Sequence, residues 1–195
     1  NITVDAMNSF ISELKEQLTC EVRYDQATKA IYAVDASIFE IEPIAVCIPR
    51  TKEDIAKAIA IAYKHKIPLI PRGAATGISG GCIGRGLVID TSKYLNRIIS
   101  IDPKQKIAIV EPGVIQDELN QACLPFNLRL GPDTSTGNRA TLGGMVANNS
   151  AGAHALYYGR MCDHIIELEV ILYTGEVIYT KQLTQQQWEE KYKLE

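Results

Sequence analysis

Residues 71–86 read Pro-Arg-Gly-Ala-Ala-Thr-Gly-Ile-Ser-Gly-Gly-Cys-Ile-Gly-Arg-Gly, a stretch in which six residues are glycine. Glycine lets the backbone adopt positive φ and lie close to a ligand. Successive backbone N–H groups in such a loop form a concave site for an anion, to which the hydroxyls of Thr76 and Ser79 and the charge of Arg72 would add. The stretch therefore favours a cradle for phosphate, and a surface loop without a ligand is the alternative.

The spacing of these glycines excludes the two commonest nucleotide-binding loops. A dinucleotide-binding fingerprint, G-x-G-x-x-G, opens a helix, and the P-loop ends in Gly-Lys-Ser or Gly-Lys-Thr. Here the spacing is Gly73-x-x-x-Gly77-x-x-Gly80, no lysine is present, and the apolar run Leu87–Asp90 predicts that a strand follows. We therefore expect a phosphate-binding loop of another fold.

The same residues contain a match to the nucleophile elbow of serine hydrolases, G-x-S-x-G, between Gly77 and Gly81. That motif requires a strand that runs directly into the serine and a helix that begins directly after it. The predicted strand ends at Pro71, and no helical pattern follows Ser79. The sequence therefore disfavours a serine hydrolase.

Hydrophobic periodicity along the rest of the chain predicts an α+β fold. The predicted elements are a helix at Val4–Leu18, a strand at Ala45–Ile48, a helix that begins at Thr51, strands at Pro68–Pro71 and Leu87–Asp90, a hairpin over Ile98–Glu111, a helix at Gln116–Cys123 and a hairpin over Ile165–Thr180. The helix after Thr51 joins two strands, and this β-α-β arrangement implies that they are parallel. We expect two subdomains: residues 1–97 with the β-α-β unit, and residues 98–195 with mainly antiparallel strands and helices.

Composition excludes several classes of function. The chain has 195 residues, a hydrophobic fraction of 46% and a formal net charge of -3, which gives no basic surface for nucleic acid. No apolar run reaches the roughly 18 residues that a transmembrane helix requires. The five cysteines are widely spread and form no C-x-x-C pair, so we expect no metal or iron–sulfur site in this chain. Cysteines without an evident partner are typical of a reducing compartment, which favours a cytoplasmic location.

Two segments of the sequence resemble the flavin-contacting segments of one known family. Residues 71–81 resemble the pyrophosphate loop of the FAD-binding domain of the vanillyl-alcohol-oxidase type, also called the PCMH type. Residues 131–152, Gly-Pro-Asp-Thr-Ser-Thr-Gly-Asn-Arg-Ala-Thr-Leu-Gly-Gly-Met-Val-Ala-Asn-Asn-Ser-Ala-Gly, resemble its second flavin-contacting segment. That domain also serves dehydrogenases of D-lactate, glycolate and D-2-hydroxyglutarate. Asp35–Pro43 and Asn138–Gly144 are most similar to the large members that carry a C-terminal iron–sulfur region.

The resemblance implies a two-subdomain PCMH-type fold with FAD held between the subdomains. The residues that would wrap the pyrophosphate, mainly through backbone N–H groups, are Arg72, Gly73, Ala74, Ala75, Thr76, Gly77, Ile78 and Ser79. Those implied at the flavin end are Pro132 and Asp133, and those on the opposite side of the cofactor are Thr141, Gly143, Gly144, Asn148, Ala151 and Gly152. We expect the chain to turn at Gly143 and Gly144 and run back into the core. Without the resemblance, Asn148 and Asn149 would indicate only a turn.

Some relatives attach the flavin covalently to a histidine of the first loop. Thr76 occupies that position here, and no histidine lies between Arg72 and Arg85, so the resemblance implies a dissociable FAD. His154 is the only histidine between Gly131 and Tyr158, which makes it a candidate for contact with flavin or substrate. A structural hydrogen bond is the commoner role of a single histidine.

The resemblance also implies a reaction, the oxidation of a small 2-hydroxy acid by hydride transfer to N5 of FAD. The cap domain, the catalytic base and the segment that contacts the adenosine half of FAD have no counterpart here. The residues from Leu183 read as the start of a helix without a stop signal. We therefore expect part of a longer protein, inactive alone, in which an iron–sulfur region would pass electrons to an acceptor in solution or at the membrane surface. The alternatives are an NADPH-dependent reductase of the same fold, such as the UDP-sugar reductase of cell-wall synthesis, and an FAD-binding module without catalysis.

Overall fold

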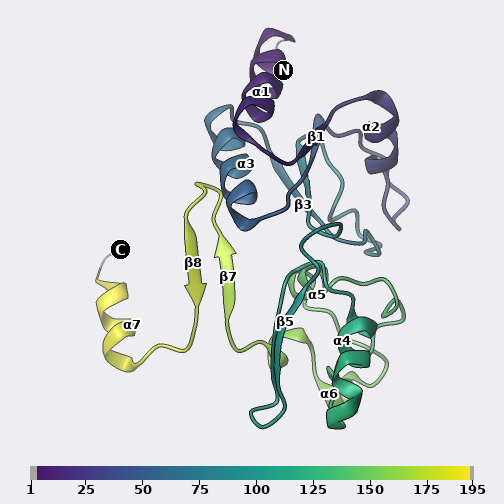
Figure 1. Ribbon diagram of the computed structural model, residues 1–195, viewed down its shortest axis with the longest axis vertical. Coiled ribbons are helices and arrows are strands. Elements are labelled where there is room, and N and C mark those ends of the chain that lie inside the picture. The colour runs from purple at the N-terminus through teal and green to yellow at the C-terminus, as the bar shows by residue number, and fades with distance from the viewer. Residues whose placement is uncertain (1–3, 194–195) are drawn as a thin grey trace.

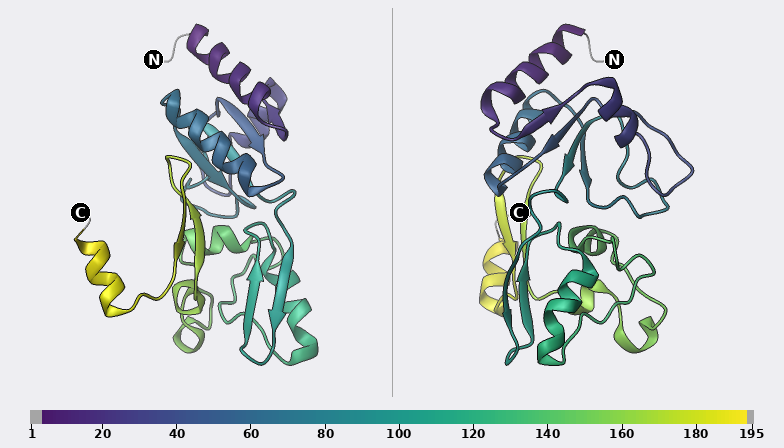
Figure 2. Two further views of the ribbon diagram at one scale, coloured as in Figure 1. Left: turned by 60° about the vertical axis from the view of Figure 1, so that its left-hand side comes forward. Right: turned by 45° about the vertical axis from the view of Figure 1, so that its right-hand side comes forward.

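The computed structural model describes residues 4–193 and shows two lobes, one above the other in Figure 1. The upper lobe holds a four-stranded sheet with helices, and the lower lobe holds a hairpin and short helices (Figure 1, Figure 2). Helices and strands are mixed in both lobes, so the predicted α+β class is confirmed. The outer limits of the two predicted subdomains, residues 1 and 195, lie outside the described residues.

The sheet of the upper lobe places its strands in the order β1-β2-β4-β3. β2 (Ala45–Ile48) and β3 (Leu69–Arg72) are both parallel to β4 (Leu87–Asp90), whereas β1 (Glu21–Arg23) is antiparallel to β2. The predicted β-α-β unit consists of β2, α3 (Lys52–Lys64) and β3, and its parallel direction is confirmed. Its two strands are not neighbours, however, because β4 lies between them.

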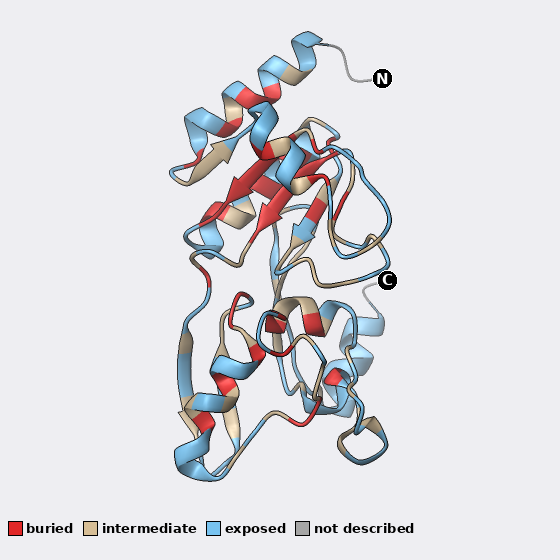
Figure 3. Cartoon of the chain, turned by 90° about the vertical axis from the view of Figure 1, so that its right-hand side faces the viewer, coloured by how far each residue is buried: buried red, intermediate tan, exposed pale blue. Residues whose placement is uncertain are grey.

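Side chains cover both faces of this sheet, whose central strands β2 and β4 are buried throughout (Figure 3). One face forms a core with α1 (Val4–Gln17) and α3; its members include Phe10, Leu14, Ala45, Cys47, Ala58, Ala62, Leu87 and Ile89. The other face carries Val46, Ile48, Ile70 and Val88, against which Tyr32 packs. Since alternate residues of a strand point to opposite faces, a strand buried on both sides is apolar throughout, as β2 is.

Two short elements of the upper lobe are absent from the sequence prediction. β1 has three residues, of which two are charged, so it shows no apolar run. α2 (Gln26–Tyr32) is formed by local polar bonds as much as by burial: the Asp25 carboxylate accepts a hydrogen bond from the Thr28 N–H at 2.9 Å. Such a cap stabilises a helix without leaving a hydrophobic period in the sequence.

The helix α3 is bounded by two well-formed caps. Thr51 Oγ1 accepts a hydrogen bond from Asp54 N, and Asp54 Oδ2 accepts one from Thr51 N, each at 3.2 Å, which confirms the predicted start. After the helix, Lys66 has φ of 55°, and the Ile67 N–H donates to Ala62 O at 2.8 Å. This is the left-handed C-terminal motif in which glycine is the usual residue.

The lower lobe surrounds a second core. It contains the antiparallel hairpin of β5 (Ile98–Asp102) and β6 (Ile107–Val110), then α4 (Gln116–Cys123) with the 3-10 turn Leu124–Phe126, α5 (Leu142–Ala147), α6 (Ala155–Tyr158) and the 3-10 turn Met161–His164. Val114, Leu119, Cys123, Ala140, Leu142, Met145 and Met161 form the core. The predicted hairpin and the predicted helix at Gln116–Cys123 are confirmed.

The turn predicted at Gly143 and Gly144 is wrong. Both glycines lie in the first turn of α5, and the chain reverses only after Asn149, which has φ of 46°. A Cβ on Gly143 would lie 2.7 Å from Cβ of Pro112, so the helix packs against that proline at a distance that only glycine allows. Tertiary packing therefore overrides the low helix propensity of the two glycines.

A second hairpin, β7 (Leu168–Ile171) and β8 (Val177–Thr180), runs from the lower lobe up to α3 (Figure 1). Lys52 Nζ lies 2.8 Å from Oε1 of Glu169, and Ile171 packs against the core of the upper lobe. The hairpin was predicted and is confirmed. Its position links the C-terminal half of the chain to the first lobe, and the subdomain division at residue 97 stays a proposal.

The last helix, α7 (Gln185–Tyr192), stands away from both lobes in Figure 1. Its start was predicted from the residues after Leu183. None of its residues is buried, and the Trp188 side chain is 60% exposed.

Candidate functional site

The two glycine-rich segments meet at the junction of the lobes, where the loop after β3 lies over α5 (Figure 1). A Cβ on Gly73 would lie 2.1 Å from Oγ1 of Thr141. A Cβ on Gly77 would lie 3.5 Å from Nδ2 of Asn148. The folded chain thus brings together residues of both segments that the resemblance assigns to one cofactor.

Thr141 carries the most informative polar atom of this junction. The residue is 4% exposed, and among residues 4–193 its buried Oγ1 has no hydrogen-bond partner. Although Thr141 occupies the N-cap position of α5, its side chain makes no capping bond. A buried hydroxyl without a partner costs about 1–3 kcal/mol, so this one fits a ligand atom that completes its bonding. It lies beside Gly73 and Gly144.

The first glycine segment has the backbone shape of a ligand loop. Ala75 has φ of 56° and Gly80 has φ of 72°. A non-glycine residue in the left-handed region costs of order 1–3 kcal/mol and is held there by its surroundings. For Ala75 that support includes its carbonyl, which accepts a hydrogen bond from Ala36 N at 3.1 Å. Ala74, Ile78 and Ser79 are exposed in this loop.

Arg72 holds the base of the loop with its side chain. Its guanidinium donates to Val34 O at 2.9 Å and to Tyr32 O and Cys82 O at 3.3 Å, and it lies over the Tyr32 ring, 4.9 Å from the centroid. The charge is therefore bound to backbone carbonyls.

The geometry around Ser79 does not match a nucleophile elbow. β3 ends at Arg72, and between there and β4, which begins at Leu87, the described chain contains no helix. Ser79 is exposed in an irregular loop. The structure thus agrees with the sequence in disfavouring a serine hydrolase.

The start of the second glycine segment is fixed by buried and half-buried polar groups. Pro132 is buried, and its carbonyl accepts a hydrogen bond from Gln116 Nε2. Asp133 accepts from His154 N at 3.2 Å and is also hydrogen bonded to His154 Nδ1. These bonds lower the pKa of the Asp133 carboxyl. Gly152 lies against the same carboxylate, where a Cβ would come within 1.9 Å of Oδ1.

The remaining predicted site residues face different parts of the structure. The Gly143 N–H donates to Pro112 O at 2.8 Å, so this glycine is directed to the protein interior and not to the first loop. Gly144 faces Thr141, since a Cβ there would meet Oγ1 at 3.2 Å. Ala151 is exposed and forms an isolated β-bridge with Arg160.

Several supporting residues were not identified from the sequence. Gln116 was assigned only to a helix, yet it is 2% exposed and also accepts a hydrogen bond from Thr134 Oγ1 at 2.7 Å. Phe39 and Ser37 pack against Gly80, where a Cβ would lie 3.1 Å from the Phe39 ring. A glutamine directly after the apolar pair Val114-Ile115 at a helix start was the available signal for Gln116.

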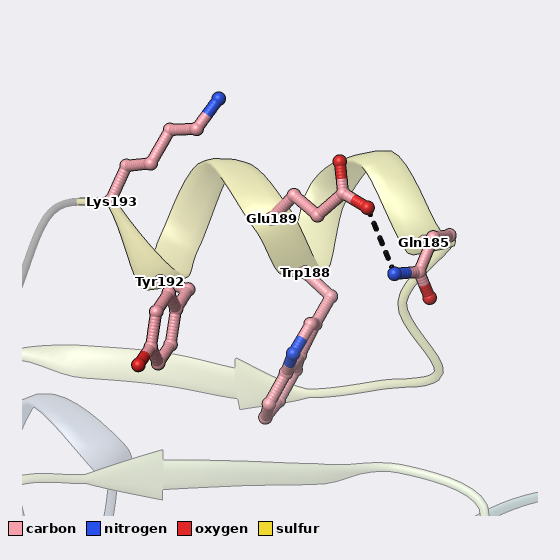
Figure 4. Close-up of a pocket in the computed structure, with 5 residues that line it drawn as sticks. All are labelled: Gln185, Trp188, Glu189, Tyr192 and Lys193. Carbon is pink, nitrogen blue, oxygen red and sulfur yellow. Dashed lines mark hydrogen bonds between the residues drawn. The ribbon is translucent and has the colours of Figure 1, made fainter.

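Other features of the described chain lie away from this junction. A hollow beside α7 is lined by Gln185, Trp188, Glu189, Tyr192 and Lys193 (Figure 4). Another is lined by Glu40, Ile41, Glu42 and Arg85. In residues 4–193, no group of three His, Cys, Asp or Glu side chains is placed to hold a metal ion, and no helix is long and apolar enough to cross a membrane.

Comparison with known proteins identifies the family. A model of the FAD binding domain matches residues 43–181, which include both glycine segments. The chain is 35% identical over 184 residues to D-2-hydroxyglutarate dehydrogenase of Escherichia coli (strain K12), covering 92% of this chain and 18% of that protein. It is also 35% identical over 156 residues to glycolate oxidase subunit GlcD of Bacillus subtilis (strain 168), covering 79% of this chain and 33% of that protein. The chain thus spans about a fifth to a third of the length of these relatives.

Among solved structures, p-cresol methylhydroxylase with substrate bound superimposes with a TM-score of 0.77 at 22% identity, covering 92% of this chain and 36% of that one. This likeness confirms the PCMH-type fold, and the family model matches more than half of the residues. The chain belongs to the FAD binding domain family.

Proposed function

We propose that this chain is the FAD-binding part of an oxidoreductase that oxidises a small 2-hydroxy acid. The observation that carries the proposal is the contact between the two glycine segments, with the unpaired Thr141 hydroxyl between Gly73 and Gly144. The dehydrogenase and the oxidase subunit to which the chain is similar support the substrate class.

The residues present fit an extended anionic cofactor. The backbone of residues 72–79 would bind the pyrophosphate, with Thr141 Oγ1 as a hydroxyl donor from the second segment. Gly144, Asn148, Ala151 and Gly152 would continue the wall on that side, and Pro132 and Asp133 would border the flavin end. Gly143 supports this wall from behind through Pro112. The glycines of the two segments allow the backbone to lie close to the ligand, because glycine has no Cβ.

When bound, FAD supplies the two-electron acceptor for the hydride of the 2-hydroxy acid. The residues of this chain would hold and orient that group. Asp133 keeps His154 in place at the edge of the site, where the imidazole is 70% exposed. The base that takes the hydroxyl proton is proposed to lie in a part of the protein outside this chain.

The proposal includes a dissociable FAD, because Thr76 stands where a covalently linked relative would have histidine. It also includes an iron–sulfur region in the full-length protein and an external electron acceptor. A cytoplasmic location is included as well, in line with five free cysteines.

The NADPH-dependent reductase and the FAD module without catalysis remain rival functions. They are separated by stopped-flow reduction of the flavin in the full-length protein: a 2-hydroxy acid should bleach it, and NADPH should not.

The cofactor is tested by the colour of the purified protein at the length of its relatives. Acid precipitation should leave a colourless pellet and release intact FAD into the supernatant. Yellow colour in the pellet would contradict a dissociable flavin. Release of FMN would contradict the role of residues 72–79, because FMN has no pyrophosphate.

A further inference from the structure

Two cysteine side chains lie in contact in the upper lobe. Cys20 immediately precedes β1, and Cys47 lies in β2, with their Sγ atoms 3.3 Å apart. In the antiparallel pairing of these strands, Val22 lies opposite Cys47. Residues two apart share a face of the sheet, so Cys20 and Cys47 form a diagonal pair on the face that packs against α1 and α3.

The two sulfur atoms differ in accessibility. Cys47 is fully buried in the core, whereas Cys20 is half-buried at its margin. A small polar reagent therefore reaches Cys20 first, and Cys47 is shielded until Cys20 has reacted.

The two thiols also differ in acidity. The hydrogen bond from Cys47 lowers the pKa of Cys20 against the opposing effects of burial and of the Asp54 charge. The same interaction, together with burial, raises the pKa of Cys47. Since Cys20 is the more accessible of the two sulfur atoms and the thiolate is the reactive form of cysteine, Cys20 is the attacking sulfur of the pair.

The other three cysteines have different surroundings. Cys82 Sγ donates to Asp35 Oδ2 at 3.5 Å, Cys162 Sγ lies 3.8 Å from Asp163 Oδ1, and Cys123 is buried in the lower lobe. Within the described chain, Cys20 and Cys47 are the only two cysteines whose sulfur atoms are in hydrogen-bond contact with each other.

We propose that Cys20 and Cys47 are a redox-modification site that forms a reversible intramolecular disulfide when the protein meets hydrogen peroxide. The Cys20 thiolate attacks one peroxide oxygen, the O–O bond breaks, and the departing hydroxide takes up a proton to become water. Cys20 is then a sulfenic acid. Cys47 attacks that sulfur, its proton leaves with the hydroxyl group as a second water, and the S–S bond forms. Two thiols and one peroxide thus give one disulfide and two waters, and a dithiol reductant reverses the change.

The bond would require the sulfur atoms to move from 3.3 Å to about 2.05 Å. It would close the segment between residues 20 and 47. That segment contains α2 and Ala36, whose N–H supports Ala75 in the first glycine loop. Oxidation would therefore tether the part of the upper lobe on which the cofactor loop rests.

The experiment uses the Cys162→Ser variant, because this substitution removes the exposed thiol and leaves Cys20 and Cys47 unchanged. The protein is treated with equimolar hydrogen peroxide, alkylated under denaturing conditions and digested without reduction for mass mapping. The expected result is one cross-linked peptide pair containing Cys20 and Cys47. The melting temperature should rise by about 5–10 °C and return to its starting value with dithiothreitol, since cross-linking restricts the unfolded chain.

Single variants separate the two roles. Cys20→Ser should show neither the cross-link nor the rise in melting temperature. Cys47→Ser should leave Cys20 as a sulfenic acid that dimedone labels. Should Cys47→Ser fail to fold, the comparison of Cys20→Ser with its parent decides alone. The proposal is overturned if peroxide converts Cys20 to sulfinic acid while Cys47 stays alkylatable, or if the cross-links join other cysteines or separate molecules.

Discussion

The hydroxyl of Thr141 stands 2.1 Å from the point where a side chain on Gly73 would begin, so the second glycine segment occupies the space that the first leaves free. This contact joins the two lobes at the proposed FAD site. It also makes the site testable by substitutions that add or remove single atoms.

Gly73→Ala should abolish FAD binding. The new Cβ would overlap Thr141 Oγ1, so one of the two glycine segments would have to shift. The measurement is the rise in melting temperature on adding FAD, which reaches about 5–10 °C for the parent at a hundredfold excess over Kd. Gly81→Ala is the matched control, since a Cβ there meets nothing within 4 Å. Equal FAD responses in the two variants would show that the contact does not border the cofactor.

Thr141→Val should separate folding from binding. Removing a buried hydroxyl without a partner should leave the apoprotein as stable as the parent or more stable, by up to about 1–3 kcal/mol in urea unfolding. FAD affinity should fall by about 0.5–1.5 kcal/mol, the value of one hydrogen bond. A variant with lower apoprotein stability and unchanged FAD affinity would mean that the hydroxyl serves the fold and not the ligand.

Gly144→Val should remove bound flavin, because a larger side chain at this position points to Thr141, whose hydroxyl faces Gly73 of the first loop. Gly143→Ala should instead lower the stability of the apoprotein by about 1–3 kcal/mol, since its Cβ would overlap Pro112 in a packed interior. Urea unfolding and FAD titration of both variants give the comparison. A folded Gly144→Val protein that FAD stabilises as strongly as the parent contradicts the assignment.

Lys66→Gly should stabilise the protein by about 0.5–1 kcal/mol, since glycine adopts the left-handed conformation after α3 without the cost that a side chain adds. The control is Lys64→Gly in the last turn of the helix, which should cost about 1 kcal/mol. Urea midpoints provide both values. A loss of stability in Lys66→Gly would indicate that the lysine side chain contributes more than its backbone strain costs.

The hydrogen bonds between Asp133 and His154 predict that the stability of the protein falls at acid pH. These hydrogen bonds lower the pKa of Asp133 below the ordinary value of 3.8, so the bonded carboxylate contributes stability above that pH, and the contribution is lost as pH falls through the lowered value. Carbon-detected titration should place the parent carboxyl below 3.8, and His154→Ala should return it toward that value. An unchanged Asp133 titration in His154→Ala would contradict the interaction.

The parts of this fold that can be predicted from the sequence are those in which a local residue pattern alone determines the secondary structure. β2 is apolar at every position because both of its faces are covered, and the start of α3 is marked by Thr51 and Asp54, which form its N-terminal cap. The helical state of Gly143 and Gly144 does not follow, because it depends on Pro112, a residue distant in the chain. Likewise, the charge of Arg72 suggested a partner for phosphate, and no sequence pattern shows that its guanidinium donates hydrogen bonds to the carbonyls of Val34 and Tyr32.

The β7–β8 hairpin has a consequence for the order in which the protein folds. Lys52 and Glu169, which join α3 to this hairpin, are 117 positions apart in sequence, and Ile171 belongs to the core of the upper lobe. Contacts of such separation form late, because a long stretch of chain has to be ordered before they can be made. During synthesis, α3 therefore lacks the partner for its outer side until nearly the whole of this chain has left the ribosome. The upper lobe is thus translated before the lower lobe but is completed only after it.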